Sequence, residues 1–247
     1  MISLRVWVCA VLLLPAMPIH AGHPMLSEDT GTQGAGNFEL ELGYDWSRLD
    51  DARSFLFQPQ LSYGTSPSLD LIIQPAWLRA SDPSGAHTQG LGDTNLDFKW
   101  RFFGVAPLSL GVRAGFELPT SQRGLGLPHG RIGSHGILVA TIDAAPWAFD
   151  LNAGLTHLDM DSSARSNLVH ISGAAQFIIN EHLVLILDTS ADSNPDRAQP
   201  NLTAVALVGA IYSVHPGLDL DAGFRGRLNT GAPAQQWLLG ITYRGAF

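Results

Sequence analysis

Residues 237–247 read Trp-Leu-Leu-Gly-Ile-Thr-Tyr-Arg-Gly-Ala-Phe, and their side chains alternate in character. One face carries the large apolar residues and ends on an aromatic one: Trp237, Leu239, Ile241, Tyr243 and Phe247. A period of two places successive side chains on opposite sides of a β-strand. An amphipathic last strand of this kind is typical of a transmembrane β-barrel, so the stretch predicts an all-β, antiparallel barrel.

The same stretch predicts how the chain is assembled. A last strand with Tyr243 and a terminal Phe247 resembles the signal that the bacterial barrel-assembly machinery recognises. We therefore expect that machinery as a partner and the cell outer membrane of a Gram-negative bacterium as the location. Outer-membrane lipid and lipopolysaccharide are the expected surroundings.

The N-terminus has the pattern of a secretory signal peptide. Arg5 precedes an apolar run over residues 6–14, and the small residue Ala21 stands at the expected cleavage position. The run is shorter than the roughly 20 residues that a membrane-spanning helix needs. The predicted organisation is a signal peptide (residues 1–21), a periplasmic N-terminal segment (residues 22–36) and an outer-membrane β-barrel (residues 37–247).

Composition excludes several functions. The formal net charge of −8 argues against nucleic acid as a partner. The only cysteine, Cys9, lies in the predicted signal peptide, so neither a disulfide nor a cysteine metal ligand is expected in the mature chain. The nine histidines are scattered and form no pair with metal-ligand spacing beside a carboxylate, so we expect no metal and no cofactor.

The rest of the chain repeats the alternating pattern. Segments of about ten residues alternate with period two and are separated by Gly, Pro, Asn, Asp and Ser. The clearest examples are residues 38–46, 93–102 and 218–228. Together with eight further segments and the closing strand, they predict about twelve strands, within two. A barrel of that size should enclose a narrow, polar, partly plugged pore.

The connections between these segments predict the orientation. Long and short connections alternate along the chain, and the long ones include the first, residues 47–53, and the third, residues 79–92. Outer-membrane barrels have short periplasmic turns and longer extracellular loops, with both termini in the periplasm. We therefore assign the long loops to the outside. A periplasmic β-sandwich gives no reason for such alternation.

Charged residues of both signs lie on the faces predicted to line the lumen. A turn centred near Val105 would place Asp97 opposite Arg113 as a salt bridge, and closure of the barrel should bring Arg244 to Glu39 or Glu41. These charges either pair to hold the wall rigid or form a selectivity constriction, and both interpretations stay open. The predicted set is Glu39, Glu41, Asp45, Asp97, Lys99, Arg101, Arg113, Glu117, Asp219, Asp221, Arg225, Arg227 and Arg244.

Three stretches carry a resemblance to a known family: residues 23–41, beginning His-Pro-Met-Leu-Ser-Glu-Asp-Thr-Gly-Thr-Gln-Gly, residues 90–102 and residues 117–121. They resemble a family of outer-membrane transporters associated with the meta-pathway of phenol degradation. Ser121 departs from the pattern, because similar proteins usually have Gly after Leu-Pro-Thr. The resemblance covers essentially the whole mature chain and implies an outer-membrane barrel that passes small molecules, hydrophobic or aromatic compounds among them.

The longest connection, residues 118–134, is rich in glycine and lacks the lysine and following helix that a phosphate-binding loop needs. We predict that it is an extracellular gate or plug loop. Its basic residues Arg123, His129 and Arg131 could attract anionic solutes or lipopolysaccharide, and random placement explains them equally well.

One pair of residues raises the question of catalysis. His170 and Ser172 have the His-x-Ser spacing found in outer-membrane lipases and deacylases, so an imidazole could take the hydroxyl proton. However, Val169 and Ile171 make the opposite face apolar, which turns the pair into the lumen and away from a lipid substrate. Gly173 also replaces the usual following Asn. We therefore predict no catalytic residue and no enzyme.

These observations favour an outer-membrane channel or uptake protein for small molecules, hydrophobic or aromatic compounds included. The alternative from another class is a structural or surface-interaction barrel with an occluded lumen, whose loops do the work. A lipid hydrolase is the remote third candidate.

Overall fold

The computed structural model describes residues 22–49, 51–82, 84–121, 131–159, 164–230 and 232–246. The regular elements of this part of the chain are the strands β1 (Asn37–Leu49), β2 (Ala52–Ser66), β3 (Leu69–Gln74), β4 (Trp77–Ser81), β5 (His87–Leu91), β6 (Thr94–Val105), β7 (Leu108–Leu118), β8 (Gly133–Ala144), β9 (Trp147–His157), β10 (Asn167–Ile178), β11 (Leu183–Ser193), β12 (Leu202–His215), β13 (Leu218–Arg227) and β14 (Gln235–Ala246). No helix among the described residues has the length and apolar character needed to cross a membrane.

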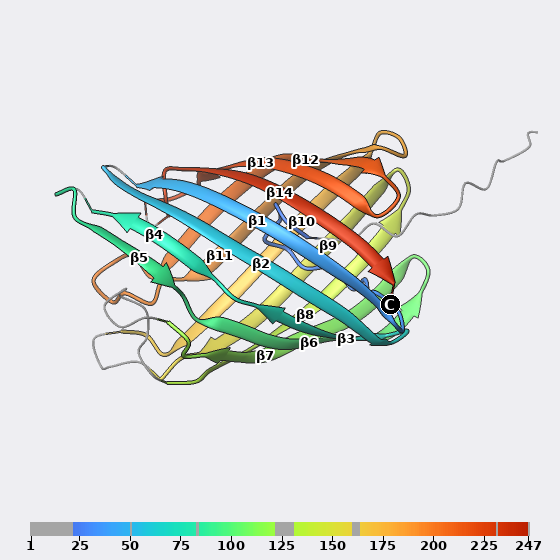
Figure 1. The fold of residues 1–247 in the computed structure, drawn as a ribbon, viewed down its shortest axis with the longest axis horizontal. Helices are drawn as coiled ribbons and strands as arrows, with labels where there is room; N and C mark the ends of the chain where they lie inside the picture. Colours follow the sequence, from blue (N-terminus) through green and yellow to red (C-terminus); the bar gives the residue numbers. More distant parts are fainter. Residues whose placement is uncertain are drawn as a thin grey trace, which may run out of the picture.

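The fourteen strands fill the twelve strand positions of one closed antiparallel barrel (Figure 1). Two of these positions are each occupied by a strand that is interrupted once. β3 and β4 both pair with β2 and together make one position, and β5, which pairs with β4, and β6, which pairs with β3, make the next. Pro75 stands in the first interruption, and proline cannot donate to the ladder. β1 pairs with β2 on one side and with β14 on the other, which closes the barrel. The predicted twelve-stranded architecture is confirmed.

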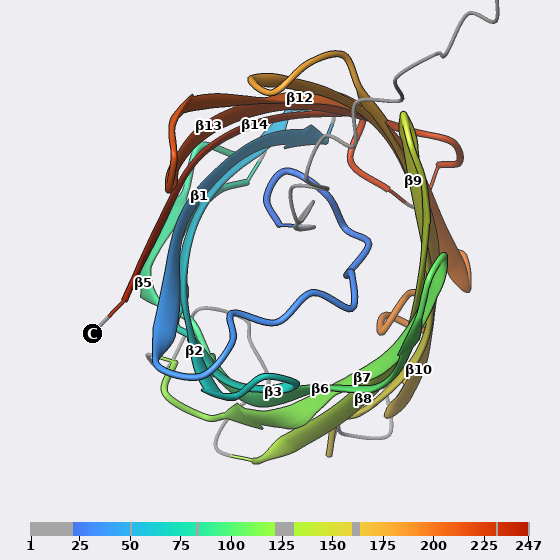
Figure 2. The ribbon, with the colours of Figure 1, turned by 90° about the vertical axis from the view of Figure 1, so that its right-hand side faces the viewer.

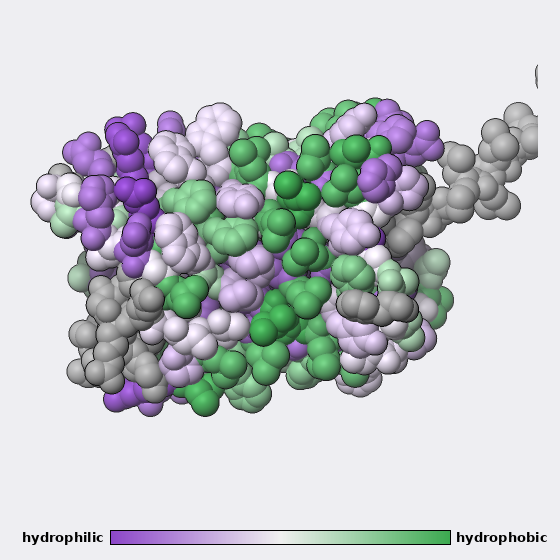
Figure 3. All heavy atoms as spheres, viewed as in Figure 1, coloured by the Kyte–Doolittle hydropathy of each residue, from purple (hydrophilic) through white to green (hydrophobic). Residues whose placement is uncertain are grey.

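The two faces of the wall differ in the way that the alternation predicts. Along β1, Glu39 and Glu41 are buried, whereas Tyr44 and Trp46 are exposed. Large apolar side chains such as Leu155, which is 65% exposed, form a belt around the barrel. In Figure 3 this belt is green, and hydrophilic residues gather toward the ends of the barrel, most clearly at the left-hand end, where Figure 1 shows the β4–β5 hairpin. An outward apolar belt of this kind matches the hydrocarbon core of a bilayer.

Two predicted long connections are wrong. β1 and β2 continue until only residues 50–51 join them, and β4 and β5 convert most of predicted connection 79–92 into a hairpin. The polar pair Ser47 and Ser54 continues the β1–β2 ladder, and their hydroxyls are hydrogen-bonded. Strands that extend beyond the apolar belt have water on both faces, so they no longer need the alternation that identified them.

The N-terminal segment lies inside the barrel. Viewed along the barrel in Figure 2, residues 22–36 run as an irregular chain, drawn in blue, within the ring of strands. Hydrogen bonds join this segment to strands around the wall, including β1, β9 and β11. The prediction of a separate periplasmic segment over residues 22–36 is therefore wrong. Its polar side chains and backbone groups satisfy polar groups of the wall. We call residues 22–36 the N-terminal plug.

Candidate functional site

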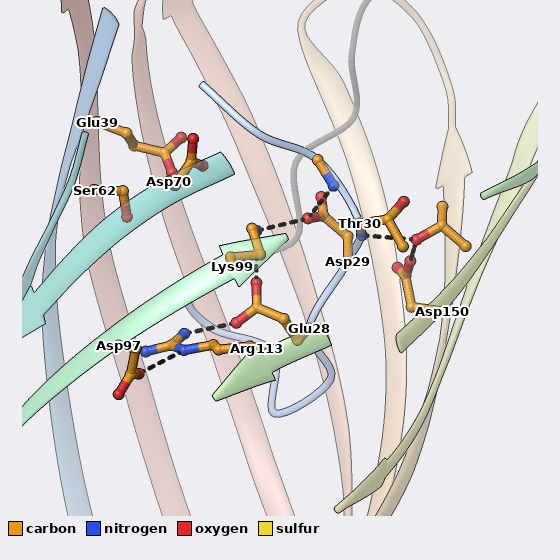
Figure 4. A network of polar contacts seen from close by, with 12 residues as sticks. Glu28, Asp29, Thr30, Glu39, Ser62, Asp70, Asp97, Lys99, Arg113 and Asp150 are labelled. Atoms are coloured by element: carbon orange, nitrogen blue, oxygen red, sulfur yellow. Dashed lines mark hydrogen bonds and ion pairs between the residues drawn. The ribbon is translucent and has the colours of Figure 1, made fainter. Parts of the chain in front are cut away.

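The centre of the N-terminal plug is Glu28, whose carboxylate contacts two cations of the wall (Figure 4). Lys99 on β6 donates to Oε1 at 2.9 Å, and Arg113 on β7 donates to Oε2 at 2.6 Å. Burial raises the pKa of Glu28, but the positive charges of Lys99 and Arg113 have the larger, opposite effect and lower the pKa to about 2. The glutamate is therefore ionised at neutral pH, and the three groups form a largely buried ion cluster.

Arg113 joins this cluster to the wall. Its Nε donates to Asp97 Oδ2 at 2.8 Å, and its Nη2 donates to Gln60 Oε1 at 3.0 Å. His135 Nε2 lies 2.9 Å from the other oxygen of Asp97. The predicted Asp97–Arg113 salt bridge is confirmed, but the two residues are not directly opposite. In the β6–β7 register, Lys99 is the residue directly opposite Arg113, because the turn is centred on residues 106–107 and a bulge follows Arg101.

The backbone of the N-terminal plug is bound by side chains of other wall strands. Asp188 on β11 accepts hydrogen bonds from the backbone N–H groups of Leu26 and Ser27, at 2.6 and 3.0 Å, and from the Ser27 hydroxyl at 3.0 Å. Asn152 on β9 accepts from Glu28 N at 2.6 Å and donates to Glu28 O at 2.8 Å. Wall side chains here replace the strand partners that this irregular segment lacks.

Further along its length, the N-terminal plug makes more polar contacts with the wall. Asp29 accepts from Lys99 Nζ at 3.1 Å, and Thr30 N donates to Thr141 Oγ1 at 3.0 Å. Gln33 N donates to Asp70 Oδ2 at 3.0 Å, while the Gln33 side chain donates to Glu39 at 2.9 Å. The segment is thus held by charged and polar contacts along its length.

The start of the N-terminal plug is anchored by His23. Its Nδ1 lies 2.6 Å from Asp221 Oδ1 and its Nε2 lies 3.1 Å from Asp45 Oδ1, while its backbone N donates to Glu41 Oε2 at 2.9 Å. Burial lowers the pKa of His23, but the hydrogen bonds to Asp221 and Asp45 outweigh it and raise the pKa to about 9. The ring is therefore an imidazolium at neutral pH, with both nitrogens donating.

Polar contacts of Arg244 join the strands at the seam where the barrel closes. Arg244 on β14 donates from Nε to Glu39 Oε2 on β1 at 2.6 Å, and from Nη1 to Asp219 Oδ2 on β13 at 2.5 Å. The predicted contact of Arg244 with one of the two glutamates is confirmed.

The remaining predicted lumen residues divide by contact. Arg225 is buried and donates to Pro24 O of the N-terminal plug at 3.3 Å, so it belongs to the cluster. Arg101 instead donates to Pro67 O at the turn between β2 and β3, Glu117 is half-buried near the long-loop end, and Arg227 is exposed. The structure thus gathers most of the predicted lumen charges around residues 22–36 and leaves these last three outside that gathering.

The other predicted features have mixed outcomes. Arg123, His129 and Phe247 lie outside the described residues, so the gate-loop and terminal-residue predictions stay predictions. Arg131 forms an exposed ion pair with Asp159 at 2.9 Å. Tyr243 is 47% exposed on the outer face, as its place in the closing strand predicts.

His170 and Ser172 do project to the lumen side, because Val169 and Ile171 are exposed on the outer face. His170 Nε2 is 3.0 Å from Ser172 Oγ, and its Nδ1 is 2.6 Å from Asp192 Oδ1. The Ser172 hydroxyl also donates to Asn152 at 3.1 Å, and Asn152 holds the backbone of Glu28. His170, Ser172 and Asp192 thus extend, through Asn152, the polar network that binds the N-terminal plug.

Sequence reasoning missed the plug side of the site altogether. His23, Glu28 and Asp29 stand in the stretch that carried the family resemblance, which was the one signal that could have drawn attention to them. On the wall, Asp188 was missed because its strand carries apolar residues on both faces. The partners could not be matched from sequence, since Leu26 and Asp188 are 162 residues apart.

The N-terminal plug leaves one cavity beside it. A space of about 240 Å³ lies between residues 22–28 and the wall, and Glu41, Asp45, Gln60, Arg113 and Arg225 are among its lining residues. The lining is dominated by polar and charged groups.

Comparison with known proteins agrees with this architecture. A family model described as "Putative MetA-pathway of phenol degradation" matches residues 24–245. An outer-membrane channel from Pseudomonas putida F1 superposes with a TM-score of 0.75, at 18% identity, over 89% of this chain and 98% of that one. The NanC porin (TM-score 0.60, 11% identity) and the KdgM porin (TM-score 0.59, 7% identity) each match over 83% of this chain and 98% of their own. At these identities the likeness shows a shared barrel fold. The comparison with curated protein sequences gave no match.

Proposed function

The chain belongs to the MetA-pathway phenol-degradation family, and from that premise we propose that it is an outer-membrane channel for small molecules whose pore is closed by the N-terminal plug. The observation that carries the proposal is the Glu28 cluster, in which the carboxylate of an irregular, non-strand segment forms ion pairs with both Lys99 and Arg113 inside a polar lumen. A barrel that served only as a scaffold would need no polar lumen, because apolar side chains of its own wall could fill the interior.

The N-terminal plug is held by contacts that water can replace. Its bonds to Asp188, Asn152 and Asp70 are hydrogen bonds between polar groups, and each wall group would be solvated if the segment moved out. A hydrogen bond exchanged for water contributes only about 1 kcal/mol between neutral groups and about 1.5–3 kcal/mol where one group is charged. Withdrawal of residues 22–36 with the strands unchanged is therefore a feasible opening step.

The solute class is proposed from two sources. The family description points to aromatic compounds, and the polar lining of the lumen favours solutes that carry at least one polar or charged group. The rival proposal is a structural or surface-interaction barrel with a permanently occluded lumen, which the many plug contacts also support. The enzyme alternative gains no support from the fold, which the chain shares with channels and porins.

The route to the membrane is part of the proposal. We infer removal of a signal peptide near Ala21, recognition of the last strand by the barrel-assembly machinery and residence in the outer membrane beside lipopolysaccharide. The exposed apolar belt and Tyr243 on the outer face support this inference.

The test is conductance in planar lipid bilayers. The mature protein should be mostly closed, whereas a variant lacking residues 22–33 should form open pores. Heat-modifiable migration on gels, the usual sign of a folded barrel, checks that the deletion variant is intact. A folded deletion variant that stays silent would contradict a plug-gated channel and favour the occluded barrel.

A further inference from the structure

We infer that the wall recess occupied by the His23 ring is a binding site for a small, flat organic cation with at least two N–H donors, of the imidazolium, amidinium or guanidinium class, and that His23 imitates this solute. The inference rests on the proposed channel function and names a solute class for it.

The floor of the recess is free of side chains. Gly43 on β1 and Gly240 on β14 are direct partners across the barrel seam, and Asp221 on β13 is the next residue in the same row. A Cβ added to Gly43 would lie 2.7 Å from His23 Cδ2, and one added to Gly240 would lie 2.5 Å from His23 Nδ1. The two glycines therefore leave room for a flat ring against the backbone.

Carboxylates stand on both sides of this floor. Asp221 Oδ1 and Asp45 Oδ1 contact the two ring nitrogens, and Glu41 accepts from the adjacent backbone N–H. Arg225 Nη1 is the nearby cation, 3.9 Å from Asp45 Oδ2. Without His23, three carboxylates and one guanidinium give the recess a formal net charge of −2, and this negative balance favours a cation over a neutral or anionic solute.

A second observation indicates that the recess can bind more than the histidine. The Asp221 side chain is only 1% exposed, and its Oδ2 is buried without a hydrogen-bond partner among the described residues. It points over Gly240, where an added Cβ would come within 2.2 Å of it. An imidazolium has only two N–H donors, whereas an amidinium or guanidinium has more and could satisfy this oxygen as well.

The recess also borders a cavity. Gly22, His23, Gly43 and Asp45 all line the cavity of about 240 Å³ between the N-terminal plug and the wall. A solute in that cavity would compete with His23 for the same carboxylates. Because a ligand that binds only the vacated wall shifts the equilibrium toward the withdrawn plug, binding would be linked to opening.

The experiment measures binding of free imidazole to the mature protein in detergent at a pH of about 6, below the roughly 6.5 pKa of an unperturbed imidazole. Isothermal titration should show His23→Ala binding imidazolium at least about 10-fold more tightly than the unmodified protein, in which the ring occupies the site. Adding Asp221→Asn should weaken that binding about 10-fold or more, the usual effect of losing a hydrogen bond to a charged group. His182→Ala, which removes an exposed histidine outside this recess, should create no new site. If His23→Ala does not give a heat-modifiable barrel, His23→Asn takes its place.

Equal imidazole binding by the unmodified protein and the folded His23 variant would overturn the inference, as would binding unaffected by Asp221→Asn. Titration with guanidinium tests the class, and it should bind the His23 variant at least as tightly as imidazolium does. Because binding is measured without a bilayer, the site is tested separately from the channel. Binding in a barrel that never conducts would overturn the proposed function alone, and a conducting plug deletion without binding would overturn this inference alone.

Discussion

Arg244 on the last strand and Glu39 on the first are joined by a hydrogen bond of 2.6 Å from Nε to Oε2, directly across the seam that closes the barrel. The same guanidinium reaches Asp219 on β13, so one cation serves carboxylates from two different strands. Glu39 also accepts from Gln33 of the N-terminal plug at 2.9 Å. Barrel closure and plug position therefore share a residue.

The first prediction concerns this seam. Arg244→Met should destabilise the barrel by on the order of 3 kcal/mol, because removing this half-buried cation leaves the buried carboxylates of Glu39 and Asp219 uncompensated. Urea unfolding in detergent, followed by tryptophan fluorescence, measures the change. Arg131→Met is the matched control, since its pair with Asp159 is exposed and should contribute less than about 1 kcal/mol. Equal effects of the two substitutions would contradict the role of the seam.

The second prediction concerns the centre of the N-terminal plug. Glu28→Gln should raise the open probability in planar bilayers about 10-fold or more, because Lys99 and Arg113 lose a charge partner worth roughly 1.5–3 kcal/mol. Glu181→Gln, at an exposed turn at the opposite end from the long loops, should change nothing. An unchanged open probability in Glu28→Gln would show that this ion cluster does not hold the pore closed.

A third prediction follows from His23. Its pKa is raised to about 9 in the docked state, against about 6.5 for a free histidine. A raised pKa means that the ring stabilises docking fully below pH 6.5 and loses this contribution as the pH rises through 9. Open probability should therefore increase between pH 7 and 10 in the unmodified protein. His23→Asn should lack this step, and an identical pH profile in both proteins would refute the assignment.

A fourth prediction concerns ion selectivity. Buried carboxylates of the wall outnumber buried cations: Glu39, Glu41, Asp70, Asp97, Asp150, Asp188, Asp219 and Asp221 stand against Lys99 and Arg225, with Arg113 and Arg244 half-buried. The pore lacking residues 22–33 should therefore prefer cations. Reversal potentials in a salt gradient measure the preference, and the double substitution Asp188→Asn with Asp221→Asn should reduce it. An anion-selective pore would contradict this charge balance.

The barrel could be predicted from sequence because its evidence is local. Period-two alternation in residues 38–46 and 218–228 identifies strands without any knowledge of their partners, and closure then pairs Arg244 with the glutamates of the first strand. The Asp97–Arg113 bridge was found for the same reason, although the register differs, because long side chains reach diagonal neighbours.

The N-terminal plug could not be predicted in this way. Residues 22–36 have no regular period, and their partners are scattered over the wall, from Glu41 to Asp221, which is 198 residues from His23. Nothing local distinguishes a polar segment that folds into a lumen from one that stays in the periplasm. The extended hairpins were missed for a related reason, since strands with water on both faces carry no alternating signal.

The central claim, that the N-terminal plug closes the pore, is tested most directly by locking it reversibly. Ser27 Oγ lies 3.0 Å from Asp188 Oδ1, so cysteines at these two positions would be direct neighbours, one on the plug and one on the wall. In the double variant Ser27→Cys with Asp188→Cys, with disulfide formation verified by mass, the oxidised protein should be silent in a planar bilayer and should begin to conduct when a reductant is added. Equal conductance before and after reduction would contradict the account.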